Sequence, residues 1–159
     1  MIVDLRSNSG GTMESVTAVA DYLMGEGTIV TVKYTGGREA VEKSDAAHAV
    51  TVPICVLINE GTASAAELLA GGLRDNNGAV LIGMNTYGKG VVNQPFMIDS
   101  NSAVILTIGE YFLPCGDNIH QVGLKPDIEV KIENQTASVF VMPESSDTQL
   151  QRAIEELKS

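Results

Sequence analysis

Two residues, Ser64 and Lys89, have the types and the settings of a nucleophile and its base. Ser64 lies where an apolar segment gives way to a helical pattern, and Lys89 lies between two glycines. A serine hydroxyl attacks a carbonyl carbon when a neighbouring base takes its proton, and a lysine amine acts as that base in its neutral form. Because burial among apolar groups favours the neutral amine, we expect a tight, apolar environment around Lys89.

Both residues also have simpler interpretations. A serine at a strand-to-helix turn is often a helix cap, and a lysine between glycines is often a solvated loop residue. A phosphate-binding loop is disfavoured, because Lys89 follows no glycine-rich run of the P-loop kind and no serine or threonine comes after it. The two cysteines and two histidines lack metal-ligand spacing, so we predict neither a metal site nor a disulfide framework.

Length and charge restrict the class of protein further. The 159 residues make one domain, and the net charge of −10 disfavours nucleic acid and anionic membranes as partners, since both would be repelled. No apolar run approaches the roughly 20 residues of a membrane-spanning helix. A strand pattern starts at residue 2, so we expect the chain to be a fragment of a longer protein.

Hydrophobic periodicity predicts an α/β order of elements. Strands are expected at residues 2–5, 28–34, 38–43, 52–58, 79–82, 91–98, 103–111 and 128–132, and helices at 13–24, 65–75 and 147–158. Residues 52–58 form a continuous apolar run, which is typical of a strand covered on both faces. Small-residue loops follow two strands, at residues 7–11 and 59–64.

These elements divide into a core, a linker and a terminal helix. We assign residues 1–132 to the core, 133–146 to a polar linker and 147–159 to an amphipathic helix. The apolar stripe of that helix, Leu150, Ile154 and Leu157, has no obvious partner in the core. We therefore predict uncovered apolar surface and a homodimer that hides it, by exchange of the terminal helix.

Four segments together resemble a known family. They are residues 4–11 (DLRSNSGG), 59–67 (NEGTASAAE), 87–90 (YGKG), and 114–119 with Gly123, Pro126 and Asp127. In this order and spacing, over about residues 2–130, they are similar to the core of the carboxyl-terminal processing (tail-specific) proteases. The resemblance implies a Clp protease/crotonase-like α/β fold, in which β-strands pack with helices, and a serine peptidase that uses no metal or nucleotide cofactor. It also implies an upstream PDZ domain, which this chain lacks, and a location in the cell envelope or otherwise outside the cytoplasm.

The resemblance also assigns roles within the site. It implies that Ser64 attacks the scissile carbonyl, that Lys89 is the general base, and that the backbone amides of Gly10 and Ala65 form the oxyanion hole. The position of Ala65 at a helix N-terminus independently favours a developing negative charge. The family's third catalytic residue is usually glutamine, sometimes glutamate, four positions after the lysine. Here that position is Asn93, to which we assign the role, and Gln94 beside it is the alternative.

The function that this implies is a serine endopeptidase acting at or near accessible C-terminal tails of unfolded or partly unfolded proteins. A non-catalytic peptide-binding or scaffold domain of the same fold is the alternative. Acyl-CoA chemistry on this fold is a third reading, which rests on fold analogy and which the serine and lysine disfavour. Activity on an unfolded protein would separate the first reading from the others.

Overall fold

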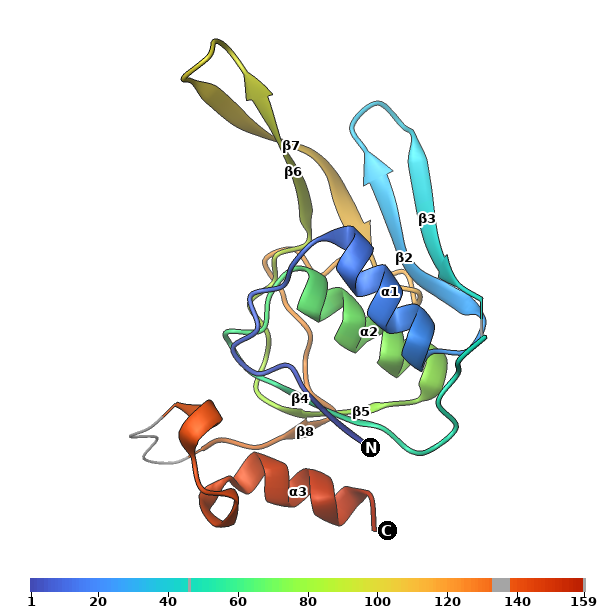
Figure 1. Ribbon diagram of the computed structural model, residues 1–159, viewed down its shortest axis with the longest axis vertical. Coiled ribbons are helices and arrows are strands. Elements are labelled where there is room, and N and C mark those ends of the chain that lie inside the picture. Colours follow the sequence, from blue (N-terminus) through green and yellow to red (C-terminus); the bar gives the residue numbers. More distant parts are fainter. Residues whose placement is uncertain (46, 133–137, 159) are drawn as a thin grey trace.

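The computed structural model describes residues 1–45, 47–132 and 138–158, and shows two sheets with helices around them (Figure 1). The first sheet is parallel, in the order β1-β4-β5-β8, and the second is antiparallel, in the order β3-β2-β7-β6. The parallel strands are β1 (Ile2–Asp4), β4 (Cys55–Ile58), β5 (Val80–Gly83) and β8 (Ile128–Glu129). The antiparallel strands are β2 (Gly27–Tyr34), β3 (Glu39–Ser44), β6 (Val91–Met97) and β7 (Ala103–Phe112). The predicted α/β class is confirmed.

Three α-helices accompany the sheets in the described part of the chain, and the strands β4 and β8 are each three residues shorter than predicted. The helices are α1 (Met13–Leu23), α2 (Ala65–Asn77) and α3 (Thr148–Glu156), with short 3-10 helices η1 (Val139–Val141) and η2 (Glu144–Ser146). β4 begins only at Cys55, because Pro53 has no N–H for a ladder. β8 stops at Glu129, because its neighbour β5 ends at Gly83 and leaves nothing further to pair with.

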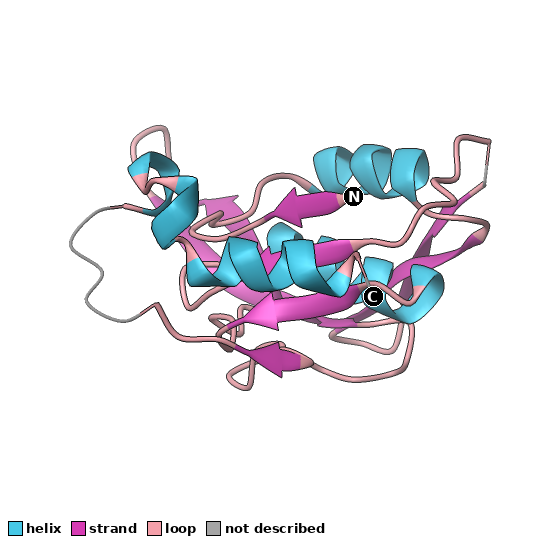
Figure 2. Cartoon of the chain, turned by 90° about the horizontal axis from the view of Figure 1, so that it is seen from below, coloured by secondary structure: helices cyan, strands magenta, loops and turns pink. Residues whose placement is uncertain are grey.

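The central strand β4 is buried on both faces, as its apolar run predicts. Val56 and Ile58 pack into a core with α1 and α2, whereas Cys55 and Leu57 pack on the other face with Ala153 of α3. Successive side chains of a strand alternate between faces, so one apolar segment serves two cores. Seen from below in Figure 2, α3 lies across the strands of this sheet.

The expectation that the terminal helix lacks a partner in the core is wrong. Leu150 and Leu157 pack against the cluster of Cys55, Leu57 and Ile82, and Ala153 is fully buried. Two of the three stripe residues of α3 are therefore covered by the chain's own sheet. Of the predicted linker, residues 133–137 lie outside the described residues, and the described remainder contains η1 and η2.

Candidate active site

Three loops meet at the carboxyl ends of the parallel strands. The glycine loop (residues 7–11) follows β1, the serine loop (residues 59–64) follows β4, and the lysine loop (residues 84–90) follows β5. Parallel strands bring such loops to one edge of a sheet, where α/β proteins place their ligands. Thr62 is fully buried and joins the serine loop to the end of β1 and to the lysine loop. Its hydroxyl donates to the Leu5 carbonyl at 2.8 Å, and its carbonyl accepts from Tyr87 N–H at 3.0 Å.

Ser64 stands at the sharp turn from the serine loop into α2. Its φ of 56° and ψ of −125° are rare for a residue with a side chain, and such backbone strain is typical of active sites. A serine on a strained strand-to-helix turn is exposed toward substrate while its backbone stays fixed. Ser64 is half-buried here and occupies the N-cap position of α2.

Glu67 joins the serine to the lysine loop. Its side chain is fully buried, and four donors converge on its carboxylate: Ser64 N–H at 2.8 Å, Thr86 Oγ1 at 2.5 Å, Gly88 N–H at 2.7 Å and Lys89 N–H at 2.9 Å. These bonds compensate the burial of the acid. One oxygen, Oε2, accepts from both Ser64 and Lys89, so the two backbones meet at a single atom.

The lysine loop brings the backbone of Lys89 close to that of Ser64 but does not bury the Lys89 side chain. Gly88 and Gly90 on either side are buried, and a Cβ on Gly88 would approach Gly123 N to 2.8 Å while one on Gly90 would approach His120 N to 2.6 Å. The segment around His120 and Gly123, which includes part of the fourth family-like segment, thus packs against the lysine loop. The Lys89 side chain itself is exposed, so the apolar enclosure expected for it is not supplied by the described residues.

The two predicted oxyanion donors lie together. Gly10, at φ +95°, packs so closely that an added Cβ would come within 2.7 Å of Ala63 O and 2.9 Å of Ala65 N. Ala65 N–H, at the start of α2, finds no acceptor within the part of the chain that the structure describes. Gly10 N–H donates to Asn8 Oδ1 at 2.9 Å, so a substrate oxygen must replace that amide oxygen.

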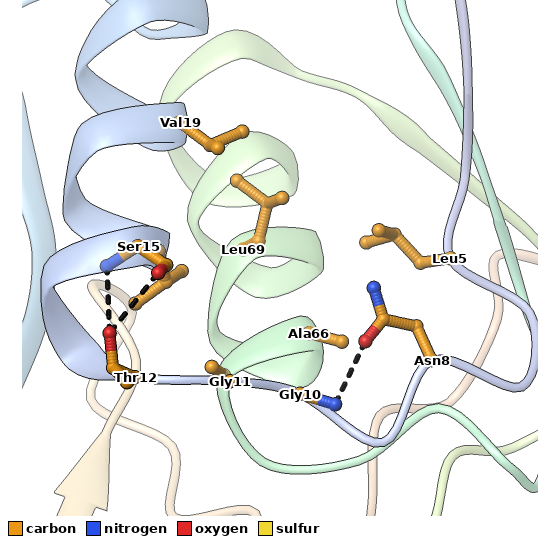
Figure 3. Close-up of a pocket in the computed structure, with 11 residues that line it drawn as sticks. Leu5, Asn8, Gly10, Gly11, Thr12, Ser15, Val19, Ala66 and Leu69 are labelled. Atoms are coloured by element: carbon orange, nitrogen blue, oxygen red, sulfur yellow. Dashed lines mark hydrogen bonds between the residues drawn. The ribbon is translucent and has the colours of Figure 1, made fainter.

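A small apolar pocket opens beside these donors (Figure 3). It has a volume of about 130 Å³ and lies between the glycine loop, α1 and α2. Apolar and polar side chains line it: Leu5, Val16, Val19, Ala65, Ala66 and Leu69, together with Asn8, Thr12 and Ser15. Because it is small and lined mostly by apolar side chains, this pocket suits a small side chain.

Comparison with known proteins identifies the family. A family model for peptidase family S41 matches residues 1–130. The chain belongs to peptidase family S41. It is 37% identical over 157 residues to the carboxyl-terminal-processing protease of Synechocystis sp., covering 97% of this chain and 36% of that protein. It is 40% identical over 153 residues to carboxyl-terminal-processing peptidase 3, chloroplastic, of Arabidopsis thaliana, covering 91% and 29%.

Solved structures agree with this assignment. The photosystem II D1 C-terminal processing protease matches with a TM-score of 0.78 at 31% identity, over 95% of this chain and 37% of that one. The tricorn protease matches in fold, with a TM-score of 0.59 at 20% identity, over 99% and 15%. The predicted Clp/crotonase-like fold is thereby confirmed. The S41 chain spans about a third of the length of the curated relatives it matches.

Asn93, where this chain departs from the glutamine usual in the family, makes its hydrogen bond with a neighbouring strand and not with Lys89. Asn93 lies on β6, where its Oδ1 accepts from Thr107 Oγ1 at 2.9 Å across the strand pair. Neither Asn93 nor Gln94 bonds the Lys89 side chain among the residues described, and both are exposed. The third catalytic role thus stays a prediction.

Sequence reasoning missed one cluster near the S41 site. Arg6, Asp147 and Gln149 are all nearly fully buried, and Arg6 donates hydrogen bonds to the other two. Arg6 lies within a family-like segment, but Asp147 lies far along the chain with no local signal except a helix cap.

Among the described residues, no helix is both long and apolar enough to cross a membrane.

Proposed function

We propose that the protein containing this chain is a serine endopeptidase that cleaves at or near accessible C-terminal tails of unfolded or partly unfolded proteins. The observation that carries the proposal is the Glu67 carboxylate, which holds the backbones of Ser64 and Lys89 together at the N-terminus of α2. A nucleophile and its base must be held in fixed relation before substrate binds, and a buried carboxylate with four donors does this.

The proposed reaction has two halves. Ser64 Oγ forms a bond to the scissile carbonyl carbon while the Lys89 amine takes the hydroxyl proton, and the oxyanion is received by Ala65 N–H and Gly10 N–H. The C–N bond then breaks as the lysine returns the proton to the leaving amine. Water attacks the resulting ester, with the lysine again as base, and releases the carboxylic acid and free Ser64.

Substrate selection follows from the pocket beside the oxyanion donors. A peptide whose carbonyl oxygen points at Ala65 N–H would place its neighbouring side chain near the 130 Å³ pocket. The apolar lining and small volume favour a small aliphatic side chain there over a charged or aromatic one. Large residues at that position should therefore slow cleavage.

Location and assembly are further parts of the proposal. The Arabidopsis relatives carry the description chloroplastic, and we propose that this protein likewise acts outside the cytoplasm. We also propose a homodimer, although α3 is docked on its own sheet. The exposed side chains Met97, Ile98 and Ile105 of the β6–β7 hairpin supply apolar surface for such contact.

The test is activity of the full-length parent protein on an unfolded protein substrate. Ser64→Ala and Lys89→Ala should each reduce turnover by about four orders of magnitude, because the two groups act as a unit. Ser102→Ala in the β6–β7 turn and Lys43→Ala on β3, both at exposed positions of the antiparallel sheet, should not. In the same assay Asn93→Ala should lower turnover and Gln94→Ala should not, if Asn93 orients the lysine.

A second candidate, a non-catalytic peptide-binding domain, is favoured by the exposure of Lys89 and by the Asn8 oxygen on Gly10 N–H. It predicts that wild type and Ser64→Ala bind peptide equally and cleave nothing. Substantial cleavage by Ser64→Ala would contradict both candidates.

A further inference from the structure

Arg6 lies at the centre of a buried polar cluster outside the residues assigned to chemistry. Its guanidinium donates through Nε and Nη2 to Asp4, with the shortest distance 2.7 Å. Nη1 and Nη2 donate to the two oxygens of Asp147, each at 2.8 Å, and Nη1 also donates to Gln149 Oε1 at 3.1 Å. All five N–H donors of the arginine are thereby used, and two carboxylates face one cation.

Two of these partners belong to the start of α3. Asp147 caps the helix, accepting from Leu150 N–H at 3.0 Å, and its side chain is 4% exposed. Gln149 also donates to the Val130 carbonyl at 2.7 Å, just beyond β8. The helix α3 covers the face of the parallel sheet opposite α1 and α2 (Figure 1). Its N-terminal residue Asp147 nevertheless contacts Arg6, just after the carboxyl end of β1.

Arg6 immediately precedes the glycine loop, which is anchored along its length. Ser7, at φ 56°, donates its N–H to Asn59 Oδ1 at 2.7 Å, and Asn8 accepts from Ala63 N–H at 2.9 Å. Gly10 then lies against the backbone of Ala63 and Ala65. Only three residues separate Arg6 from Gly10, and two of them are hydrogen-bonded to the serine loop, so a shift of Arg6 has a short path to the Gly10 backbone.

We propose that Asp147 and Gln149 are positioning residues: by holding Arg6, the N-terminus of α3 sets the glycine loop, and so the Gly10 N–H, against Ser64. The proposal rests on the proposed peptidase function. A buried ion pair gives little net stability compared with apolar packing, whereas its bidentate geometry fixes orientation. Turnover should therefore depend on a helix on the far side of the sheet.

The test uses Asp147→Asn in the full-length protein. Asparagine is as good a helix cap as aspartate but lacks the charge that holds Arg6. Turnover (kcat) should fall on the order of 10- to 100-fold with KM little changed, as expected when a group is misplaced rather than removed. Arg152→Gln, which breaks the 2.7 Å pair with Glu156 on the same helix, is the matched control and should leave kcat unchanged.

A second readout is independent of activity. Amide hydrogen exchange at Gly10 and Gly11, measured in a Ser64→Ala background, should speed up in Asp147→Asn and not in Arg152→Gln. If Asp147→Asn fails to fold, Gln149→Met, which keeps the ion pair and removes one acceptor from Arg6, should show both effects at smaller size.

Folded Asp147→Asn protein with wild-type kcat and wild-type exchange in the glycine loop would overturn the proposal. So would faster exchange confined to α3, because that would show a purely structural role. If the wild-type protein cleaves nothing, the proposed function fails, while exchange at Gly10 still decides whether α3 holds the loop.

Discussion

Glu67 combines two tasks at the scale of a single residue. As the third residue of α2, it accepts from Ser64 N–H at the helix start, where a negative charge also complements the helix dipole. The same carboxylate accepts from Gly88 and Lys89 of the lysine loop. Its position in the sequence indicates the first task, and only the folded chain reveals the second.

Replacing Glu67 by glutamine should therefore disturb the site more than its small size change suggests. The new amide group would direct its own donors at backbone N–H groups, leaving buried donors unsatisfied at a cost of about 1–3 kcal/mol in the free energy of unfolding. Turnover should fall as well, because Ser64 and Lys89 lose their common anchor. Urea unfolding and kcat measure the two effects.

Glu60→Gln is the control for this change, since Glu60 is an exposed acid on the same serine loop. It should leave stability and turnover near wild type. Equal behaviour of the two variants would show that Glu67 does not hold the loops together.

The glycine loop shows how one element depends on a single small residue. Gly10 has a positive φ and lies against the backbone of the serine loop, whereas the neighbouring Gly11 has no atom within 4 Å of an added Cβ. Backbone atoms cannot rotate away as side chains do, so the two adjacent glycines differ sharply in what they tolerate.

Gly10→Ala should consequently be damaging and Gly11→Ala mild. The first should cost about 1–3 kcal/mol in backbone strain. If its N–H is displaced from the oxyanion position, turnover should drop on the order of 100- to 1,000-fold. Thermal unfolding and kcat measured for both variants test this, and an active, stable Gly10→Ala protein would contradict the close approach.

At the scale of the whole molecule, the cluster of Arg6, Asp4, Asp147 and Gln149 joins the carboxyl end of β1 to the start of α3. Burial by itself would raise the pKa of Asp147, but the hydrogen bonds and charge of Arg6, with the Leu150 N–H, outweigh it and lower that pKa below its ordinary value. Burial likewise opposes the charge of Arg6, yet Asp4 and Asp147 raise the pKa of the guanidinium further. The ion pair is therefore intact in the folded chain at neutral pH.

The lowered pKa of Asp147 predicts how stability changes in acid. Because the folded state holds this carboxyl group ionised, its contribution is complete above the unfolded-state pKa of about 3.9 and is lost as pH falls through the lower folded-state value. Asp147→Asn should cost about 3 kcal/mol in the free energy of unfolding at pH 7. The difference in the free energy of unfolding between wild type and Asp147→Asn should become smaller toward pH 2. Urea unfolding across this range measures it, and a constant difference would contradict the prediction.

The sequence by itself determined the order of elements and indicated where the chemistry is expected. Apolar runs and helical spacing are local properties, so the strand before Ser64, the helix after it and the loop around Lys89 could be predicted from neighbouring residues. Most boundaries moved by one or two residues, and the largest shifts among the strands came where the partner strand or a proline decided them, at β8 and β4. The shared family segments then assigned Ser64, Lys89, Gly10 and Ala65 to roles that the structure brings to one sheet edge.

The tertiary structure alone decided how those parts are held. Arg6 and Asp147 are 141 positions apart in the chain, and Glu67 and Lys89 are 22 apart, so no periodicity could indicate either contact. The exposure of Lys89 and the docking of α3 were likewise beyond local patterns, because burial depends on what the rest of the chain packs against a residue. Distant contacts form only after the sheet has assembled and brought the ends of its strands together.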